Sequence, residues 1–208
     1  MADFTREGVL APGAAQRVAQ VRAQLAESVR VKEALAAEQA PRIAHAAEIL
    51  AECFARGGKV LLFGNGGSAS DAQHLAAEWT GRQRRERPAL PALALTANSS
   101  DLTALGNDYG FERIFARQVE AHGRPGDVAL AISTSGNSPN VLAAVQEARR
   151  RGLHVIGLLG KDGGKLAAHV DVAIVVPSRD TQRIQECHIA IAHVLGELVD
   201  DALFPERA

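Results

Sequence analysis

Residues 127–160 read DVALAISTSGNSPNVLAAVQEARRRGLHVIGLLG. An apolar run at 127–132 is followed by a loop rich in hydroxyl groups, a helical stretch at 139–151 and a second apolar run at 153–159. Pro139 stands at the first helical position, where proline is favoured because no N–H partner is needed there. Two near-continuous apolar runs joined by a helix predict two parallel strands that are buried on both faces.

The same alternation extends in both directions from this unit. Further apolar runs predict strands at 59–63, 91–95 and 171–176, and the stretches between and after them predict helices at 68–80, from near Ser100, at 111–121, 163–168 and 181–203. Ser and Asp side chains are expected to cap the helix near Ser100. Strands that alternate with helices build a parallel sheet with helices on both faces. We therefore predict an α/β fold with a five-stranded parallel sheet, whose ligands bind at the carboxyl ends of the strands.

A long helical stretch, residues 14–56, precedes the first strand. Its apolar residues recur at three- and four-residue spacings, which is the period of a helix face that packs on another surface. Pro41 is expected to divide the stretch into helices at 14–38 and 41–56, because proline fits best in the first turn of a helix. Residues 1–40 are predicted to be a helical extension that packs on its own domain or on a neighbouring subunit.

Composition excludes several classes of protein. Hydrophobic residues make up 47% of the 208 residues, which is too many for a disordered chain, and a net charge of −1 provides no basic field for nucleic acid. No apolar run approaches the roughly 20 residues that span a bilayer, and residues 1–10 lack the pattern of a signal peptide. Cys53 and Cys187 are too few for a disulfide framework. We expect a cytoplasmic protein. The basic run at residues 82–87 is expected to be a solvated loop.

Two glycine-containing loops are candidate binding elements. The first, GNGGS at 64–68, follows a predicted strand; its glycines let backbone N–H groups approach an oxyanion, and the next helix offers its positive end. It is neither a dinucleotide fingerprint, because the third glycine is missing, nor a Walker A loop. The second, GNDYG at 106–110, is expected to be a loop at a strand end. Each is also compatible with a plain turn.

Four hydroxyl groups fall within six residues at the end of the strand 127–132. They belong to Ser133, Thr134, Ser135 and Ser138, directly before the helix that begins at Pro139. Hydroxyl and N–H groups at a helix N-terminus form a neutral cradle for phosphate. Helix capping explains one hydroxyl, that of Ser138, and leaves the other three unexplained. No lysine lies in the loop, which favours a sugar phosphate over a nucleoside triphosphate.

Two helices carry candidate metal-binding or acid–base groups. His74 and Glu78 are four residues apart and share one face of a helix, a spacing that suits a metal site and also a plain surface pair. On the last helix Gln185 and His188 share a face easily, whereas Gln185 and His193 are about 12 Å apart along the axis. Spacing alone therefore favours His188 over His193.

As a set, several motifs resemble those of the sugar isomerase (SIS) domain family and, more narrowly, of the phosphoheptose isomerases. They are GNGGS, TGR, GNDYGF, STSGNS, GKDGG and RIQE-x-H, spread over residues 40–204. The resemblance implies a five-stranded parallel sheet, an SIS domain at 41–208 and a homotetramer whose sites draw on more than one subunit. It also implies an isomerase that converts sedoheptulose 7-phosphate to D-glycero-D-manno-heptose 7-phosphate through an enediol.

The resemblance further implies the roles of individual residues. One zinc ion per subunit is expected to be held by His74, Glu78, Gln185 and His193, so that the resemblance favours His193 where spacing favours His188. Glu78 is then the catalytic base and His193 the catalytic acid. Further contacts with the substrate are expected from Asn65, Gly66, Gly67, Asn107, Asp108, Gln185 and Glu78, and contacts with its phosphate from Ser133, Thr134, Ser135 and Ser138.

Other functions are compatible with parts of the sequence. A sister branch of the same family is non-catalytic and binds the replication initiator, and the segments AQHLAAE and LVDDALF resemble that branch. It lacks the catalytic glutamate and histidine, so Glu78 and His193 favour the isomerase. A sugar-phosphate sensor without turnover and an isomerase of a different sugar phosphate are further alternatives. We expect a sugar phosphate as ligand, and neither nucleic acid nor a membrane as partner.

Overall fold

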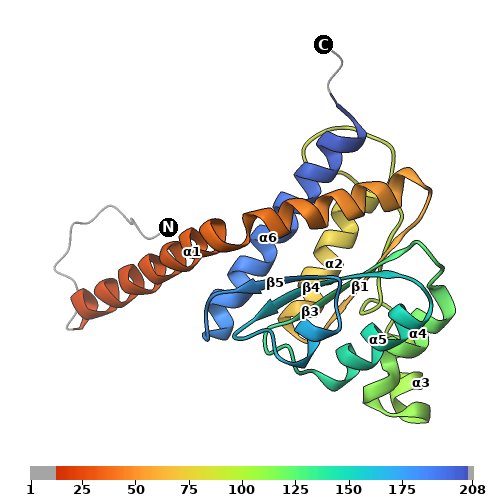
Figure 1. Ribbon diagram of the computed structural model, residues 1–208. Coiled ribbons are helices and arrows are strands. Elements are labelled where there is room, and N and C mark those ends of the chain that lie inside the picture. Colours follow the sequence, from red (N-terminus) through yellow and green to blue (C-terminus); the bar gives the residue numbers. More distant parts are fainter. Residues whose placement is uncertain (1–12, 206–208) are drawn as a thin grey trace, which may run out of the picture.

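The computed structural model describes residues 13–205, so residues 1–10, on which the expectation about a signal peptide rests, lie outside the described part. The core is a five-stranded sheet in the order β2-β1-β3-β4-β5, and all its pairs are parallel (Figure 1). The strands are β1 Val60–Gly64, β2 Ala92–Ala94, β3 Val128–Ser133, β4 His154–Gly160 and β5 Val172–Val176. The predicted α/β fold with five parallel strands is confirmed.

Helices cover both faces of the sheet, with α1, α2 and α6 on one face and α3, α4 and α5 on the other (Figure 1). Their bounds are α1 Ala14–Ala55, α2 Gly67–Thr80, α3 Ser99–Tyr109, α4 Ile114–His122, α5 Pro139–Arg150 and α6 Thr181–Leu203, with 3-10 helices η1 Phe111–Arg113 and η2 Lys165–Ala168. Neighbouring strand residues point to opposite faces, so Leu62 packs under α2 and α6 while Leu61 packs under α4 and α5. Burial on both sides is why β1 is apolar, and why β3 is apolar up to Ser133 at its end.

Helix α1 is continuous through Pro41, so the predicted division into two helices is wrong. Pro41 and Ala37, whose carbonyl loses its helical N–H partner, both lie on the exposed side of α1, where water can donate to that carbonyl. Leu35 before the proline and Ile43 after it are buried in the same core cluster. Packing on both sides of Pro41 therefore keeps the helix in one piece. The division into domains at residue 40 stays a prediction.

The first half of α1 carries an apolar stripe that the described chain leaves uncovered. Val18, Val21, Leu25 and Val29 are 41–64% exposed, and this end of the helix projects beyond the sheet (Figure 1). Although α1 has 42 residues, neither it nor any other helix within residues 13–205 is long and apolar enough to cross a membrane.

The region after β2 differs from the prediction in two details. Helix α3 is capped by Asn98, whose Oδ1 accepts hydrogen bonds from the N–H groups of Ser100 and Asp101, and not by a Ser or Asp side chain. The GNDYG segment, predicted to be a strand-end loop, forms the last turn of α3. Gly110 ends that helix with a φ of 82°, a conformation that favours glycine. Turn-forming residues are tolerated in this last turn, so their presence did not mark a loop.

Candidate active site

His74 and Glu78 of α2 meet His193 of α6. The His74 Nε2 atom lies 3.2 Å from Glu78 Oε1 and 3.2 Å from His193 Nε2, and His193 Nε2 lies 3.7 Å from Glu78 Oε1. The Glu78 side chain is 19% exposed, whereas those of His74 and His193 are 49% and 43% exposed. The cluster therefore has a protected carboxylate and two imidazoles that solvent can reach.

The three atoms of this cluster have the separations of ligands that share one metal ion. Ligand atoms about 2.0–2.1 Å from a tetrahedral ion lie about 3.4 Å from one another, close to the measured spacing. Glu78 Oε2 is buried and has no hydrogen-bond partner within residues 13–205, so the protein alone does not satisfy this carboxylate. Two imidazoles and one carboxylate are a ligand set that zinc takes in catalytic sites. The donor set thus fits a divalent transition metal.

Gln185, the fourth predicted ligand, lies elsewhere along the contact between α2 and α6. Its amide sits against Gly67, at the beginning of α2, where a Cβ atom would clash with it. His193 is eight residues further along α6 and faces His74, seven residues further along α2. Within the described residues Gln185 makes no hydrogen bond to His74 or His193. Its ligation of a metal stays a prediction.

His188, the histidine that spacing favours, is fully buried and belongs to the protein core. Its Nε2 lies 3.0 Å from the carbonyl oxygen of Leu159 in β4, and burial lowers the pKa of the imidazole to about 4. A helical periodicity shows which side chains share a face but not what that face packs on. His188 therefore lies on the face of α6 that packs on the sheet, away from the cluster that includes His193.

The GNGGS loop joins β1 to α2 at the carboxyl edge of the sheet. Gly64 has no room for a Cβ atom, which would lie 2.8 Å from the carbonyl oxygen of Ile132 in β3. Gly66 has a φ of 57°, which favours glycine, and it directly precedes α2. Asn65 and Asn140 exchange two hydrogen bonds of 2.9 Å through their amides. These two bonds tie the glycine loop to the first turn of α5.

The hydroxyl loop lies beside the glycine loop, at the end of β3. The Ser133 and Ser138 Oγ atoms are 3.1 Å apart, and Ser135 Oγ accepts a hydrogen bond from the N–H of Asn137. Ser138 occupies the N-cap position of α5, but its side chain caps no N–H group of the helix. Helix capping therefore does not account for the presence of any of these hydroxyl groups. Thr134 Oγ1 makes no hydrogen bond within residues 13–205. The loop is a polar cradle in front of a helix N-terminus.

Asn107 and Asp108 are exposed in the last turn of α3, where the Asn107 amide donates a 2.8 Å hydrogen bond to Asp108 Oδ1. In the described part of the chain, no hydrogen bond links this pair to the other candidate residues. The substrate contacts expected of the pair stay predictions.

Sequence reasoning missed several residues around the site. Asn140 supports the glycine loop, and its signal was an amide in the first turn of an otherwise apolar helix. Asp71 lies one helical turn before His74; burial raises the pKa of its carboxyl, an effect that the nearby His74 charge opposes. Arg87 is 1% exposed and paired with Asp200 at 2.8 Å, so the prediction of a solvated loop at 82–87 is wrong at this residue. No local signal distinguishes Arg87 from the exposed Arg82 nearby.

The chain is similar to proteins of one family over most of its length. A model of the SIS domain matches residues 24–160. A phosphoheptose isomerase of Roseiflexus sp. (strain RS-1) is 55% identical over 183 residues, which are 88% of this chain and 93% of that protein. The structure of phosphoheptose isomerase from Neisseria gonorrhoeae has a TM-score of 0.83 and 49% identity, covering 88% of this chain and 97% of the other. For a phosphoheptose isomerase from Francisella tularensis the TM-score is 0.86 and the identity 40%, over 89% and 98% of the two chains. The resemblance seen in the motifs is confirmed: the chain belongs to the SIS domain family and, within it, to the phosphoheptose isomerases.

Proposed function

We propose that this protein is an isomerase that converts sedoheptulose 7-phosphate to D-glycero-D-manno-heptose 7-phosphate through an enediol. The observation that carries this proposal is the contact of His74, Glu78 and His193, in a chain that also has two polar loops at the carboxyl edge of its sheet. Phosphoheptose isomerases that share more than half of their residues with this chain support it.

The hydroxyl loop is the proposed phosphate site. Ser133, Thr134, Ser135 and Ser138 offer neutral donors in front of α5, whose N-terminus carries partial positive charge. His74 lies seven residues into α2, about 10 Å along the helix axis from its beginning. A phosphate held at the loops therefore leaves room for a long carbon chain before the acid–base cluster, as a seven-carbon sugar has.

Glu78 and His193 are the proposed acid–base pair. In the ketose-to-aldose direction, a base removes a proton from C1, the enediol forms, and a proton is delivered to C2 while the C1 hydroxyl becomes the carbonyl. Glu78 is the proposed base, and its low exposure protects the carboxylate from bulk water. His193 approaches from the other helix and is the proposed acid for the hydroxyl protons. Asn65, Gly66, Gly67, Gln185, Asn107 and Asp108 are the further residues proposed to contact the sugar.

Zinc is the metal that we propose for this site, with one ion per subunit. His74, Glu78 and His193 would hold it, with Gln185 as the fourth ligand. When bound, the ion supplies positive charge that polarises the carbonyl and stabilises the enediolate. Because one carboxylate cannot be a tight ligand and a free base at once, we infer that Glu78 changes its coordination during turnover.

A non-catalytic protein that binds the replication initiator is the alternative from a different class. That branch lacks the glutamate and the histidine that lie 3.7 Å apart here, and the similar proteins are named as isomerases. The alternative is therefore not favoured. Turnover on a panel of sugar phosphates separates the heptose from other substrates and from a sensor without activity.

A homotetramer is the proposed assembly, with sites at subunit interfaces. An apolar groove of about 390 Å³ between α1 and α6 supports it, together with the exposed stripe at the beginning of α1. Contiguous exposed apolar surface is a feature of protein–protein interaction sites. A neighbouring subunit would also bring Asn107 and Asp108 to a site. Two unpaired, buried cysteines favour the proposed location in the cytoplasm.

The decisive experiment is an isomerase assay on purified protein. Sedoheptulose 7-phosphate is incubated with enzyme that is metal-replete, treated with a chelator, or treated and then resupplied with zinc, and heptose 7-phosphate is followed by NMR. We expect conversion, its loss with the chelator and its return with zinc. Absence of conversion by the metal-replete enzyme would refute the proposed reaction, and full activity after metal removal would refute the role of the ion.

A further inference from the structure

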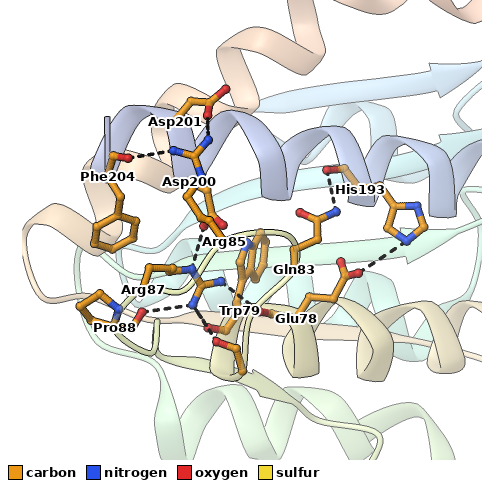
Figure 2. A network of polar contacts seen from close by, with 11 residues as sticks. Glu78, Trp79, Gln83, Arg85, Arg87, Pro88, His193, Asp200, Asp201 and Phe204 are labelled. Carbon is orange, nitrogen blue, oxygen red and sulfur yellow. Dashed lines mark hydrogen bonds and ion pairs between the residues drawn. The ribbon is translucent and has the colours of Figure 1, made fainter. Parts of the chain in front are cut away.

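The loop 81–88, which follows α2 and crosses to α6, contacts the backbone of both proposed catalytic residues (Figure 2). Gln83 Nε2 donates a hydrogen bond of 3.2 Å to the carbonyl oxygen of His193. Arg87 Nη2 donates one of 2.9 Å to the carbonyl oxygen of Glu78. Two side chains of one short loop thus form hydrogen bonds with the main chain of Glu78, the proposed base, and of His193, the proposed acid.

Arg87 closes the end of α2. Its guanidinium also donates to the carbonyl oxygens of Trp79 at 2.7 Å and Gly81 at 3.1 Å. The last carbonyls of a helix have no partner within the helix, and a cation there is favoured by the helix dipole. The Arg87 side chain is 1% exposed, so these bonds form away from water.

The same guanidinium connects α2 to α6. Arg87 Nε lies 2.8 Å from Oδ1 of Asp200, whose side chain is 5% exposed. Asp200 is seven residues, or about two helical turns, beyond His193 on the same helix. Arg87 therefore fixes the end of α2 that carries Glu78 against the helix that carries His193.

Gln83 reaches the backbone of His193 because α6 has a glycine, Gly196, where the Gln83 side chain lies against the helix. A Cβ atom on Gly196 would clash with Gln83 Oε1. Glycine is unfavourable in a helix interior, and here its absent side chain admits the amide to the backbone of α6. Of the other loop residues, Arg85 bonds Asp201 and the carbonyl oxygen of Phe204, beyond the end of the site.

We propose that Gln83 and Arg87 are positioning residues that set the separation of Glu78 and His193. The inference rests on the proposed function, since it assigns the two residues a role through the proposed acid–base pair. Their hydrogen bonds to the proposed acid and base go to main-chain carbonyl groups and not to the reacting side chains. Loss of either one shifts one helix against the other, which separates the metal-binding atoms and the acid–base groups at the same time.

The first test replaces Gln83 with methionine, which keeps the length of the side chain and removes only the hydrogen bond. Gln118→Met is the matched control, because Gln118 is buried and donates to the carbonyl oxygens of Leu95 and Ile114 on the opposite face of the sheet. The dissociation constant for zinc is measured by chelator competition, next to Tm, kcat and KM. We expect Gln83→Met to bind zinc about 10–100-fold more weakly and to lose kcat by a similar factor, with KM unchanged. Gln118→Met is expected to change Tm alone.

The second test compares Arg87→Lys with Arg85→Lys. Lysine keeps the charge but not the fork that reaches Asp200 and the carbonyl oxygens of four residues, Glu78, Trp79, Gly81 and Pro88, so the Arg87 variant is expected to weaken zinc binding and lower kcat. The Arg85 variant loses contacts of the same loop with the same helix and is expected to keep both values. The proposal is overturned if Gln83→Met and Arg87→Lys bind zinc like the wild type, or if each control loses as much zinc affinity as its partner variant.

The zinc measurement separates this inference from the proposed function. If the wild type does not convert sedoheptulose 7-phosphate, the proposed reaction fails, while the dissociation constants of the four variants still decide whether the loop positions the cluster. If the wild type is active and the variants match it, the reaction stands and the positioning role fails.

Discussion

The hydroxyl loop and the His74–Glu78–His193 cluster are built in opposite ways. The loop takes its four hydroxyls from residues 133–138, within one connection between a strand and a helix. The cluster joins side chains that are 119 residues apart and depends on how α2 packs on α6. A site made of neighbours in the chain survives small shifts of the fold, whereas a site made of two helices is sensitive to each contact between them.

The largest effect is expected in the cluster, from Glu78→Gln. The amide keeps the shape and one ligand oxygen but cannot accept a proton, so kcat should fall by about 10²–10⁴-fold while the protein folds and still binds sugar phosphate. Turnover is measured beside the oligomer size by gel filtration. A variant that keeps most of its activity would show that the base lies elsewhere, and Asp108 would be the next candidate.

The two histidines of α6 should differ in their effect on metal binding, since only His193 belongs to the cluster. His193→Ala should weaken zinc binding by more than the roughly 10–100-fold that outer partners of a metal ligand typically contribute. His188→Gln should retain the metal, because His188 is buried beside the carbonyl oxygen of Leu159 and is not part of the cluster. Zinc content after dialysis measures both. The reverse ranking would mean that the metal site includes His188.

The buried His188 should affect how the free energy of unfolding depends on pH. The pKa of His188 is about 4 in the folded state and about 6.5 in the unfolded state, so the unfolded state binds more protons between these values. The contribution of His188 to the free energy of unfolding is therefore present above pH 6.5 and is lost as the pH falls toward 4. The loss amounts to about 3 kcal/mol. Urea unfolding between pH 7 and 4, in the presence of a chelator, should show this loss in the wild type and not in His188→Gln. Parallel curves for the two proteins would contradict the assignment.

The smallest effects are expected in the hydroxyl loop. One hydrogen bond to a charged phosphate contributes about 1.5 kcal/mol or more, so Ser133→Ala or Ser135→Ala should raise KM by at least about tenfold. The phosphate is held in the ground state and in the transition state alike, so kcat should change less than KM. Steady-state kinetics on both variants and on Ser138→Ala provide the measurement. An unchanged KM in all three would place the phosphate elsewhere.

Most of the fold was predictable because its signals are local. Each strand is largely an apolar run, and the central strands β1 and β3 are buried on both faces as such a run requires. The continuity of α1 was not predictable, because Pro41 is a strong local signal that packing on both of its sides overrides. The last turn of α3 was missed because residues 106–110 have turn propensity, although the last turn of a helix tolerates such residues and Gly110 then ends it.

The candidate site was predictable in part. The spacing of His74 and Glu78 marked them as a pair, and the strand end at Ser133 marked the hydroxyl loop. The partner on α6 was not accessible in this way, since spacing favoured His188 and only the motif resemblance favoured His193. Arg87 lies in a run of charged residues that resembles any solvated loop, and its burial depends on Asp200, 113 residues away.

By itself the sequence determined the parallel sheet, the two polar loops at its carboxyl edge and the pairing of His74 with Glu78. These features follow from backbone preferences and side-chain periodicity over fewer than about 15 residues. The tertiary structure alone decided which histidine of α6 reaches Glu78, where Gln185 lies, and that Arg87 is buried at the end of α2. These outcomes depend on the packing of two helices far apart in the chain, and packing is set by the shape of both surfaces at once.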